Sequence, residues 1–252
     1  MTFYGDLMTR LLPQSVISNG IYATLSKKIR RYINRLRSPK GVFNDIYSRN
    51  RWGGERGEMY SGSGSRGEAA VQYANYVKDF ILSNNIKSVV DLGCGDFFIG
   101  QQIAIVVESY VGIDVVPSLI EFNNKKFGSD NVSFICADIT SDNLPEGTLC
   151  LVRQVLQHMS NAQIARLLSR LRKYELVIIT EHQPGVEDLK IPNIDKVHGD
   201  DTRLYKGSGV YLDKDPFNVS SVRLLFEYSG SYQLDSDDVH KRGSIRSFLI
   251  GR

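Results

Sequence analysis

The fold is decided by the stretch Val89-Val90-Asp91-Leu92-Gly93-Cys94-Gly95-Asp96. Its apolar start runs into a carboxylate, and two glycines follow. A short apolar run bounded by glycines predicts a buried strand. Glycines at the end of a strand let a ligand approach the backbone closely, because no side chain stands in the way. The stretch therefore predicts a strand that leads into a ligand-binding turn.

Two common nucleotide-binding motifs do not fit this turn. A dinucleotide-binding turn has the pattern GxGxxG, but the third residue after Gly95 is Phe98, so the glycine that packs helix against strand is missing. The phosphate-binding pattern GxxxxGK[ST] does not occur anywhere in the chain. The sequence therefore disfavours NAD and nucleoside triphosphates, and it favours a ligand that is not held by its phosphates.

Outward from the turn, short apolar runs alternate with segments of helical periodicity. We expect strands at 88–92, 110–113, 132–136, 149–153 and 176–180, and helices at 68–82, 99–107, 117–127 and 161–171. Strands separated by helices are typical of βαβ units and a parallel sheet. Two later strand candidates, 222–228 and 245–250, bring the total to seven. The sequence predicts an α/β fold with a doubly wound, mostly parallel seven-stranded sheet.

Three aspartates follow three of these strands at nearly even spacing: Asp91, Asp114 in VGIDVV and Asp138 in FICADIT. Each alone could be a helix cap. Together they meet at the carboxyl edge of the sheet, where open α/β sheets bind ligands. The DLGCG run resembles the first motif of class I S-adenosylmethionine-dependent methyltransferases, and the two strands after it strengthen the resemblance.

The resemblance implies a cofactor site for S-adenosylmethionine. In that family the residue matching Asp114 takes both ribose hydroxyls, for which a carboxylate offers two acceptors. The residue matching Asp138 pairs with the adenine amino group, and Ile139 stacks beside it. The residues that we expect to bind the cofactor are Trp52, Asp91, Gly93, Cys94, Gly95, Asp114, Val115, Asp138, Ile139, Arg153 and Gln154.

The fourth expected strand ends in Leu151-Val152-Arg153-Gln154-Val155-Leu156-Gln157-His158, which resembles the family's fourth motif, where cofactor and acceptor meet. A neutral imidazole can accept the proton of an attacking hydroxyl. We therefore expect His158 to be the catalytic base, with His182, directly after the fifth strand, as the second candidate. A structural histidine at 158 is the alternative.

A finer resemblance lies before the sheet. The runs Phe43-Asn44-Asp45-Ile46-Tyr47, Asn50-Arg51-Trp52-Gly53 and Ser61-Gly62-Ser63-Gly64-Ser65 are similar to an N-terminal signature of bacterial methyltransferases associated with surface-glycan modification. The resemblance implies that a loop at 41–67 covers the methionine end of the cofactor and that Trp52 helps to exclude water. The alternative is a purely structural loop with a buried tryptophan.

The segment 183–221 is polar and carries little periodicity. We expect it to be a substrate-recognition insertion, because loops carry specificity and because Tyr205, Tyr211 and Phe217 suit a glycan. A metal site from His198, Asp200 and Asp201 is conceivable. Such clusters occur freely in loops, so we expect no metal.

The basic charge of the chain is concentrated at its start, where residues 1–40 hold eight Lys or Arg against one Asp. Ile21, Leu25, Ile29 and Leu36 recur there at helical spacing, which predicts a basic amphipathic helix. We expect a basic helical extension at 1–40 and a methyltransferase domain at 41–252. The helix either packs on the domain or associates through residues 21–37 with an anionic membrane. The rest of the chain is mildly acidic, which makes nucleic acid an unfavourable partner.

The three cysteines form no CxxC pair, and the start of the chain has no apolar run long enough for a signal peptide. We expect a cytoplasmic protein, peripheral at the inner face of the membrane if the basic helix binds lipid. The expected activity is O-methylation of a sugar hydroxyl in a polysaccharide or glycolipid precursor. The alternatives are a methyltransferase for a small metabolite or RNA, or a catalytically silent, cofactor-binding scaffold.

Overall fold

The computed structural model describes residues 20–55, 57–228 and 243–251, with the helical backbone alone for residues 20–27. The chain divides into two compact units, Met1–Ser38 and Pro39–Arg252. In the first unit the expected helix is α3 (Gly20–Arg35). Residues 1–19 of the predicted extension, and the side chains of Ile21 and Leu25, lie outside the described residues. None of the helices described is both long and apolar enough to cross a membrane.

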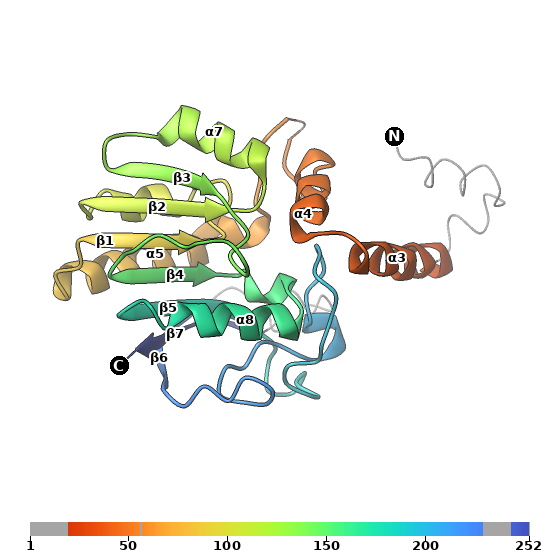
Figure 1. The fold of residues 1–252 in the computed structure, drawn as a ribbon. Coiled ribbons are helices and arrows are strands. Elements are labelled where there is room, and N and C mark those ends of the chain that lie inside the picture. Colours follow the sequence, from red (N-terminus) through yellow and green to blue (C-terminus); the bar gives the residue numbers. More distant parts are fainter. Residues whose placement is uncertain (1–19, 56, 229–242, 252) are drawn as a thin grey trace. The chain divides into compact units, whose positions relative to one another are not determined.

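The second unit is built on a seven-stranded sheet with the strand order β3-β2-β1-β4-β5-β7-β6. The first five strands are parallel, and β7 runs antiparallel to both β5 and β6. The strands are β1 (Ser88–Leu92), β2 (Ser109–Asp114), β3 (Val132–Cys136), β4 (Leu149–Arg153), β5 (Leu176–Gln183), β6 (Val222–Tyr228) and β7 (Ser244–Gly251) (Figure 1). The predicted doubly wound, mostly parallel sheet is confirmed.

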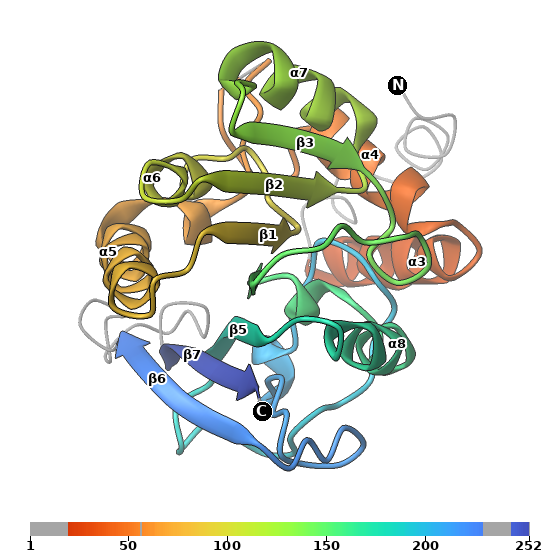
Figure 2. The same cartoon turned by 60° about the vertical axis from the view of Figure 1, so that its left-hand side comes forward.

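Among the described residues of this unit, two helices precede the first strand and three others connect parallel strands. The first two are α4 (Pro39–Ser48) and α5 (Gly67–Ser83), and the connecting helices are α6 (Gly100–Ala104), α7 (Pro117–Phe127) and α8 (Asn161–Leu171), with short 3₁₀ turns η1 (Ser63–Ser65), η2 (Leu156–His158) and η3 (Leu204–Lys206). A capping box fixes the start of α8, because Ser160 and Gln163 exchange hydrogen bonds between side chain and backbone. In Figure 2, α5 and α6 lie on the opposite side of the sheet from α8.

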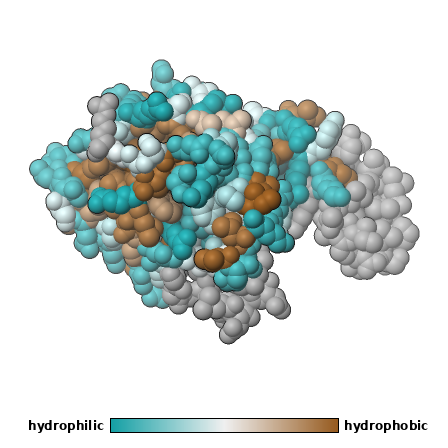
Figure 3. Space-filling view, turned by 90° about the horizontal axis from the view of Figure 1, so that it is seen from below, coloured by the Kyte–Doolittle hydropathy of each residue, from teal (hydrophilic) through white to brown (hydrophobic). Residues whose placement is uncertain are grey.

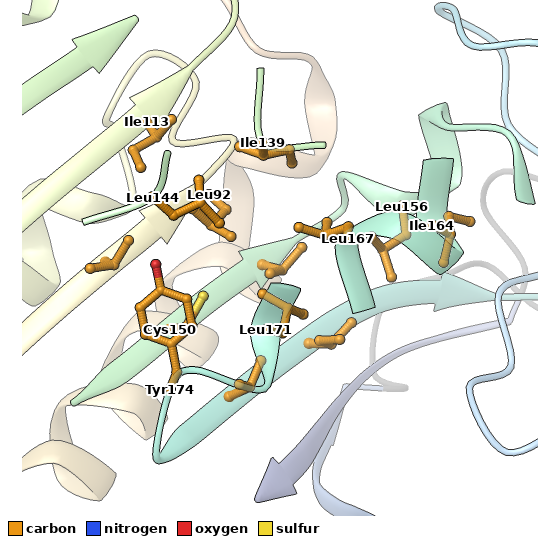
Figure 4. Packing of buried hydrophobic residues seen from close by; sticks show 14 of the residues in the cluster. Leu92, Ile113, Ile139, Leu144, Cys150, Leu156, Ile164, Leu167, Leu171 and Tyr174 are labelled. Carbon is orange, nitrogen blue, oxygen red and sulfur yellow. The ribbon is translucent and has the colours of Figure 1, made fainter. Parts of the chain in front are cut away.

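Successive residues of the central strands enter two separate cores, one on each face of the sheet. On β4, Leu149 and Leu151 join the core under α5, α6 and α7, whereas Cys150 and Val152 join the core under α8. This alternation follows from the two-residue period of a strand. It explains why these strands are apolar without interruption. Figure 4 shows the core on the α8 side, with Leu156, Ile164, Leu167 and Leu171 packed against the sheet.

The strand order reverses between β1 and β4, since β2 continues the sheet on one side of β1 and β4 on the other. The chain therefore leaves the carboxyl ends of β1 and β4 toward opposite faces of the sheet. A crevice opens at such a point, and ligands of open α/β sheets bind there. This topology selects one edge of the sheet as the place to look for a site.

The edge strand β6 is less buried than the strands at the centre. Leu224 is half exposed, and the surface on the side of β6 and β7 shows hydrophobic residues among hydrophilic ones (Figure 3). On its inner side Phe226 stacks on Tyr76 of α5, with ring centroids 5.0 Å apart. The apolar side chains of β6 are therefore shared between the core and the surface.

Three element predictions were wrong in part. The loop expected at 41–67 is helical at its start, because Pro39 begins α4, whose buried residues Val42 and Ile46 lie one turn apart; proline is favourable in the first turn of a helix, where its missing N–H costs nothing. Helix α6 is shorter than expected, with five residues. Strand β5 continues to Gln183, because it pairs with β7 along its whole length.

Candidate functional site

A cavity of about 170 Å³ lies at the carboxyl ends of the parallel strands. All eleven predicted cofactor residues line it: Trp52, Asp91, Gly93, Cys94, Gly95, Asp114, Val115, Asp138, Ile139, Arg153 and Gln154. His158 lines it too. Residues that sequence reasoning did not select also contribute, among them Phe43, Tyr47, Ser61, Tyr73 and Gln157. The structure therefore gathers the predicted residues around one space, while their individual roles stay predictions.

The glycine turn after β1 forms part of the cavity wall. Gly93 and Gly95 have positive φ angles of 80° and 56°, a conformation that side chains disfavour. A Cβ atom at Gly93 would collide with the side chain of Val155, and one at Gly95 would lie 2.5 Å from Ser61 Oγ. Both positions thus require glycine, which leaves bare backbone beside the cavity.

Asp114 ends β2 with its carboxylate held by the glycine turn. The backbone N–H of Gly95 donates to Asp114 Oδ2 at 3.2 Å, and that of Val116 donates to Oδ1 at 3.1 Å. Burial raises the pKa of Asp114 to about 6, against the lowering effect of these N–H bonds. A fixed carboxylate with spare acceptor capacity suits a pair of ligand hydroxyls.

Asp91 lies deeper, under the glycine turn. One of its oxygens, Oδ2, accepts a hydrogen bond from the hydroxyl of Tyr110 at 2.7 Å. Burial raises the pKa of Asp91 to about 6, and the Tyr110 bond opposes the shift. Asp91 therefore combines a structural bond within the sheet with a place on the cavity wall.

Asp138 follows β3 and stabilises its own turn. Its Oδ1 accepts from the backbone N–H of Thr140 at 2.9 Å and from the Thr140 hydroxyl at 2.7 Å. This is the capping arrangement that an isolated aspartate often makes. Both bonds use Oδ1, and the carboxylate still lines the cavity beside the buried Ile139. The capping and the ligand-binding interpretations of Asp138 are thus compatible.

The segment between α4 and α5 lies against the glycine turn and is fastened to it by Asp96. Ser61 and Asp96 exchange two hydrogen bonds, from Ser61 N to Asp96 Oδ2 at 2.9 Å and from Asp96 N to Ser61 Oγ at 2.8 Å. Arg66 adds a forked ion pair to Asp96, and its guanidinium lies 4.0 Å from the centre of the Phe98 ring. The hydroxyls of Tyr47 and Ser61 lie 2.7 Å apart. We call Ser61, Arg66 and Asp96 the latch.

Trp52 stands in an aromatic group at the cavity wall. Its ring contacts Tyr47 edge-on, with centroids 5.1 Å apart, and lies 6.1 Å from Phe43. On another side the ring centroids of Trp52 and His158 are 5.3 Å apart. The segment between α4 and α5 thereby reaches the turn after β4, more than 100 residues further along the chain.

Arg153 and Gln154 connect the end of β4 to the same segment. Arg153 Nη2 donates to the carbonyl of Gly64 at 2.8 Å, and its guanidinium lies 5.0 Å from the centre of the Tyr73 ring. A Cβ at Gly64 would collide with the side chain of Gln154. The close approach at Gly64 explains why the serine and glycine run contains a glycine at this point.

His158 is the one predicted base that the structure brings to the cavity. Its Nδ1 lies 3.1 Å from the carbonyl of Gly199. A carbonyl only accepts, so Nδ1 carries the proton and Nε2 is the acceptor, with the side-chain nitrogen of Gln157 3.4 Å from it. Burial lowers the pKa of His158 to about 4, with a further contribution from the charge of Lys196. The imidazole is therefore neutral at pH 7, as a base must be.

His182 lies elsewhere. It is buried on β5, paired in register with Ile245 of β7, and it does not line the cavity. Its neighbour Glu181 reaches the turn after β4, and successive strand residues point to opposite faces. The prediction assumed that any residue at the carboxyl edge of β5 faces the ligand, and the alternation of side chains decides otherwise.

The insertion at 183–221 does not contribute to the cavity wall, because none of its residues lines the cavity. It is nevertheless ordered by its own bonds. The Asn193 side chain donates to the carbonyls of Tyr211 and Asp215 and accepts from Tyr211 N. Within the part of the chain that the structure describes, no three His, Cys, Asp or Glu side chains gather to hold a metal ion. Recognition of a substrate by this insertion stays a prediction.

Comparison with known proteins places the site in a family context. Residues 89–174 match the family described as "Methyltransferase domain". No curated protein matches the sequence.

Solved structures resemble the fold at low sequence identity. The N-methyltransferase NodS from Bradyrhizobium japonicum, in complex with S-adenosyl-L-homocysteine, aligns with a TM-score of 0.53 and 11% identity over 73% of this chain and 88% of its own. Magnesium protoporphyrin IX methyltransferase from Synechocystis aligns with a TM-score of 0.52 and 14% identity over 84% and 98%. An S-adenosylmethionine-dependent methyltransferase from Clostridium acetobutylicum gives 0.50 and 10% over 73% and 92%. Residues 89–174 therefore match a methyltransferase domain, and the sheet has the Rossmann-like fold of class I methyltransferases, whose methyl donor is S-adenosylmethionine.

Proposed function

We propose that the protein transfers a methyl group from S-adenosylmethionine to a hydroxyl of a sugar in a polysaccharide or glycolipid precursor. The observation that carries this proposal is the convergence of Asp114, Trp52 and a neutral His158 on one cavity. A donor site alone needs only the carboxylates and the glycine turn. A base at the same cavity adds what transfer to a hydroxyl requires.

The residues present fit the methyl donor. Asp114 offers a carboxylate for the ribose hydroxyls, held in place by two backbone N–H groups. Gly93 and Gly95 leave the backbone bare where a side chain would collide with its neighbours. Asp138 and Ile139 supply an acceptor and an apolar surface of the kind that an adenine ring needs. When bound, S-adenosylmethionine supplies a methyl group on a sulfonium, and S-adenosylhomocysteine is the leaving group.

The chain's own residues then have three tasks. His158 accepts the proton of the acceptor hydroxyl at Nε2, because Nδ1 is committed to Gly199. The aromatic group around Trp52 and the latch cover the cavity and limit the entry of water. The turn after β4 holds His158 in place relative to the cavity, so that the hydroxyl is aligned for in-line attack.

The lining of the cavity supports a sugar as the acceptor. Trp52 and Phe43 offer ring surfaces, and Gln157 offers an amide group that can donate and accept hydrogen bonds. Rings and amides together are suited to the apolar faces and the hydroxyls of a sugar. The N-terminal runs that resemble glycan-modifying methyltransferases provide Trp52 and Ser61, which are part of this wall and of the latch.

We also propose that α3 brings the enzyme to an anionic membrane face, where lipid-linked glycans are assembled. The helix has basic residues at Lys27, Lys28, Arg30, Arg31 and Arg35 and lacks acidic residues. Ile29, Tyr32 and Ile33 are exposed on it. An amphipathic helix of this composition binds at a lipid interface through apolar burial and charge attraction. This proposal is independent of the chemistry at the cavity.

The test is release of S-adenosylhomocysteine in the presence of a panel of sugar acceptors, RNA and small hydroxylated metabolites. We expect turnover with a sugar acceptor. His158→Ala should lower turnover about 10²-fold or more and leave binding of S-adenosylhomocysteine nearly unchanged. His182→Ala is the matched control, because this buried histidine lies away from the cavity. Turnover with RNA or with a metabolite, and with no sugar, would refute the sugar as acceptor. Binding of S-adenosylhomocysteine without turnover on any acceptor would indicate a scaffold.

A further inference from the structure

The turn that carries His158 is held from behind by two buried charged residues. Glu181 comes from β5, and Arg203 comes from the insertion at 183–221. Neither residue lines the cavity. Between them they bind backbone groups of Leu156, Gln157 and Met159, which are the residues on both sides of His158.

Arg203 uses all five of its N–H donors, and four of them serve this task. Its side chain is 2% exposed, and a guanidinium has five N–H groups in a fixed fork. Nη1 donates to the carbonyls of Leu156 and Gln157 at 3.2 and 3.3 Å, and Nη2 donates to the carbonyl of Met159 at 2.8 Å and to Asn161 Oδ1 at 2.9 Å. Nε donates to the carbonyl of Ile194 at 2.8 Å. Four of the five bonds thus hold the segment from the His158 turn to the start of α8.

Glu181 holds the amide side of the same turn. Oε1 accepts from the backbone N–H of Leu156 at 2.8 Å, and Oε2 accepts from that of Gln157 at 3.1 Å. Burial raises the pKa of Glu181 to about 7, and the N–H groups of Leu156 and Gln157 and the charge of Arg203 oppose this rise, so Arg203 helps to keep Glu181 ionised. Burying either charge without the other would be costly.

The insertion also holds the ring of His158. Besides the contact of Nδ1 with the Gly199 carbonyl, Gly199 N donates to the His158 carbonyl at 3.0 Å. Two charged groups of the insertion, Lys196 and Asp201, face the ring, and they form an ion pair with each other at 3.1 Å. The uncharged ring of Trp52 meets the His158 ring from the segment between α4 and α5. Both the backbone and the side chain of His158 are therefore placed by the insertion.

We propose that Arg203 and Glu181 are positioning residues, and that they fix the turn Leu156–His158 so that His158 is held, shielded from water, at the cavity. This proposal rests on the proposed function, in which His158 is the base. It gives the insertion a role that does not require contact with the substrate. Arg203 is the residue through which the insertion controls the reaction geometry.

The chemistry of the guanidinium makes the proposal specific. A lysine at 203 keeps the positive charge beside Glu181 but concentrates its three donors on one nitrogen. It cannot reach acceptors spread over Leu156, Met159 and Ile194 at once. Misplacement of a reacting group by about 1 Å can cost on the order of 10²-fold in rate. Replacing Arg203 by lysine therefore separates the fork geometry from the charge.

The first experiment is Arg203→Lys in the full-length protein, with Arg166→Lys as the matched control. Arg166 is exposed on α8, so it undergoes the same chemical change away from the turn. The four histidines are labelled with ¹³C, and the His158 signal is identified by its loss in His158→Gln. In the wild type and in Arg166→Lys, His158 should stay neutral down to about pH 5, in accordance with its lowered pKa. In Arg203→Lys the midpoint should rise toward about 6.5, because the loosened ring meets water.

Turnover gives the second readout once the panel has identified an acceptor. Arg203→Lys should lower kcat about tenfold or more and change the KM for S-adenosylmethionine by less than about twofold. A residue that only stabilises the fold would lower the melting temperature but leave the His158 titration of the folded protein unchanged. An unchanged titration together with an unchanged kcat would overturn the proposal.

If Arg203→Lys does not fold, Glu181→Gln decides the question. The amide keeps one acceptor for the turn but places a donor against the second backbone N–H. The His158 midpoint should again rise, and wild-type behaviour of a folded Glu181→Gln would refute the proposal. The base assignment fails separately, if His158→Ala keeps full turnover. In that case a shifted titration in Arg203→Lys would still show that the turn is positioned from the insertion.

Discussion

Substituting Asp96 by asparagine should open the N-terminal segment that the latch fastens to the glycine turn. Asp96 Oδ2 accepts from Ser61 N at 2.9 Å and from Arg66 Nη2 at 3.0 Å. Oδ1 accepts from Arg66 Nη1 and from Phe98 N at 3.3 and 3.2 Å. In Asp96→Asn the amide nitrogen has to occupy one of these positions, and at either one it would face two donors. The variant thus loses two bonds and the charge together.

The burial of the ion pair between Asp96 and Arg66 determines the free energy that Asp96→Asn costs. Removing one partner of a fully buried ion pair costs about 3–5 kcal/mol, because the other charge is left uncompensated. The Asp96 side chain is 4% exposed, but that of Arg66 is 27% exposed, so water compensates part of the loss. We therefore expect about 2–3 kcal/mol. This corresponds to a factor of roughly 30 to 150 in the ratio of latched to open protein.

Trp52 makes the measurement simple, because it is the only tryptophan of the chain and lies in the latched segment. The emission of Asp96→Asn should shift to the red, and calorimetry should show at least about tenfold weaker binding of S-adenosylhomocysteine. Glu58→Gln is the matched control, since Glu58 is the exposed and more distant partner of the same Arg66, at 3.9 Å. Wild-type emission and affinity within about twofold in Asp96→Asn would refute the role of the latch.

Three further predictions concern the cofactor and the membrane. Asp114→Ala should weaken S-adenosylhomocysteine binding by about 1–3 kcal/mol through loss of the ribose bonds, and unchanged affinity in the folded variant would remove that assignment. The affinity of the wild type should also fall as pH drops below about 6, because the raised pKa of Asp114 lets the carboxylate take up a proton there; a flat affinity between pH 5 and 8 would contradict this. Full-length protein should float with anionic vesicles but not with neutral ones, and high salt should weaken this binding. Replacing Lys28, Arg31 and Arg35 together by Glu should abolish flotation, because each basic residue contributes about 1 kcal/mol to membrane binding. Flotation of the triple variant equal to that of the wild type would discard the membrane role of α3.

The sheet could be predicted well from the sequence because its central strands β1 and β4 are buried on both faces. Short, mainly apolar runs predicted the bounds of β1, β3 and β4 as the structure has them. The three aspartates could be assigned to one edge because the carboxyl ends of parallel strands lie together. These inferences use only local sequence and one rule of topology.

The latch could not be predicted in this way, since it joins residues that are distant in the chain. Ser61 and Asp96 are 35 positions apart, and the pairing depends on how the N-terminal segment crosses the glycine turn. The serine and glycine run at 61–65 indicates a loop that packs closely on something, but the run does not show that Asp96 is the residue it binds. Asp96, directly after the glycines, would otherwise pass as a helix cap.

The two histidines show the limit of placing residues by strand ends alone. His158 was expected at the cavity and lies there, whereas His182 was expected there and does not. The difference arises because His158 lies in the turn η2 after β4, whereas His182 lies within β5, where the register of the strand decides which face its side chain occupies. The buried role of Arg203 was also invisible, because arginine in a polar loop normally indicates a solvated surface.

Calorimetric titration of the full-length wild-type protein with S-adenosylhomocysteine measures most directly whether the cavity holds the methyl donor. The arrangement of Asp114, the glycine turn and the latch predicts one molecule bound per chain, with a dissociation constant on the order of 1–100 µM. The same titration of Asp114→Ala should show weaker binding at the same stoichiometry. No heat of binding to the folded wild type at millimolar S-adenosylhomocysteine would contradict the assignment of the site.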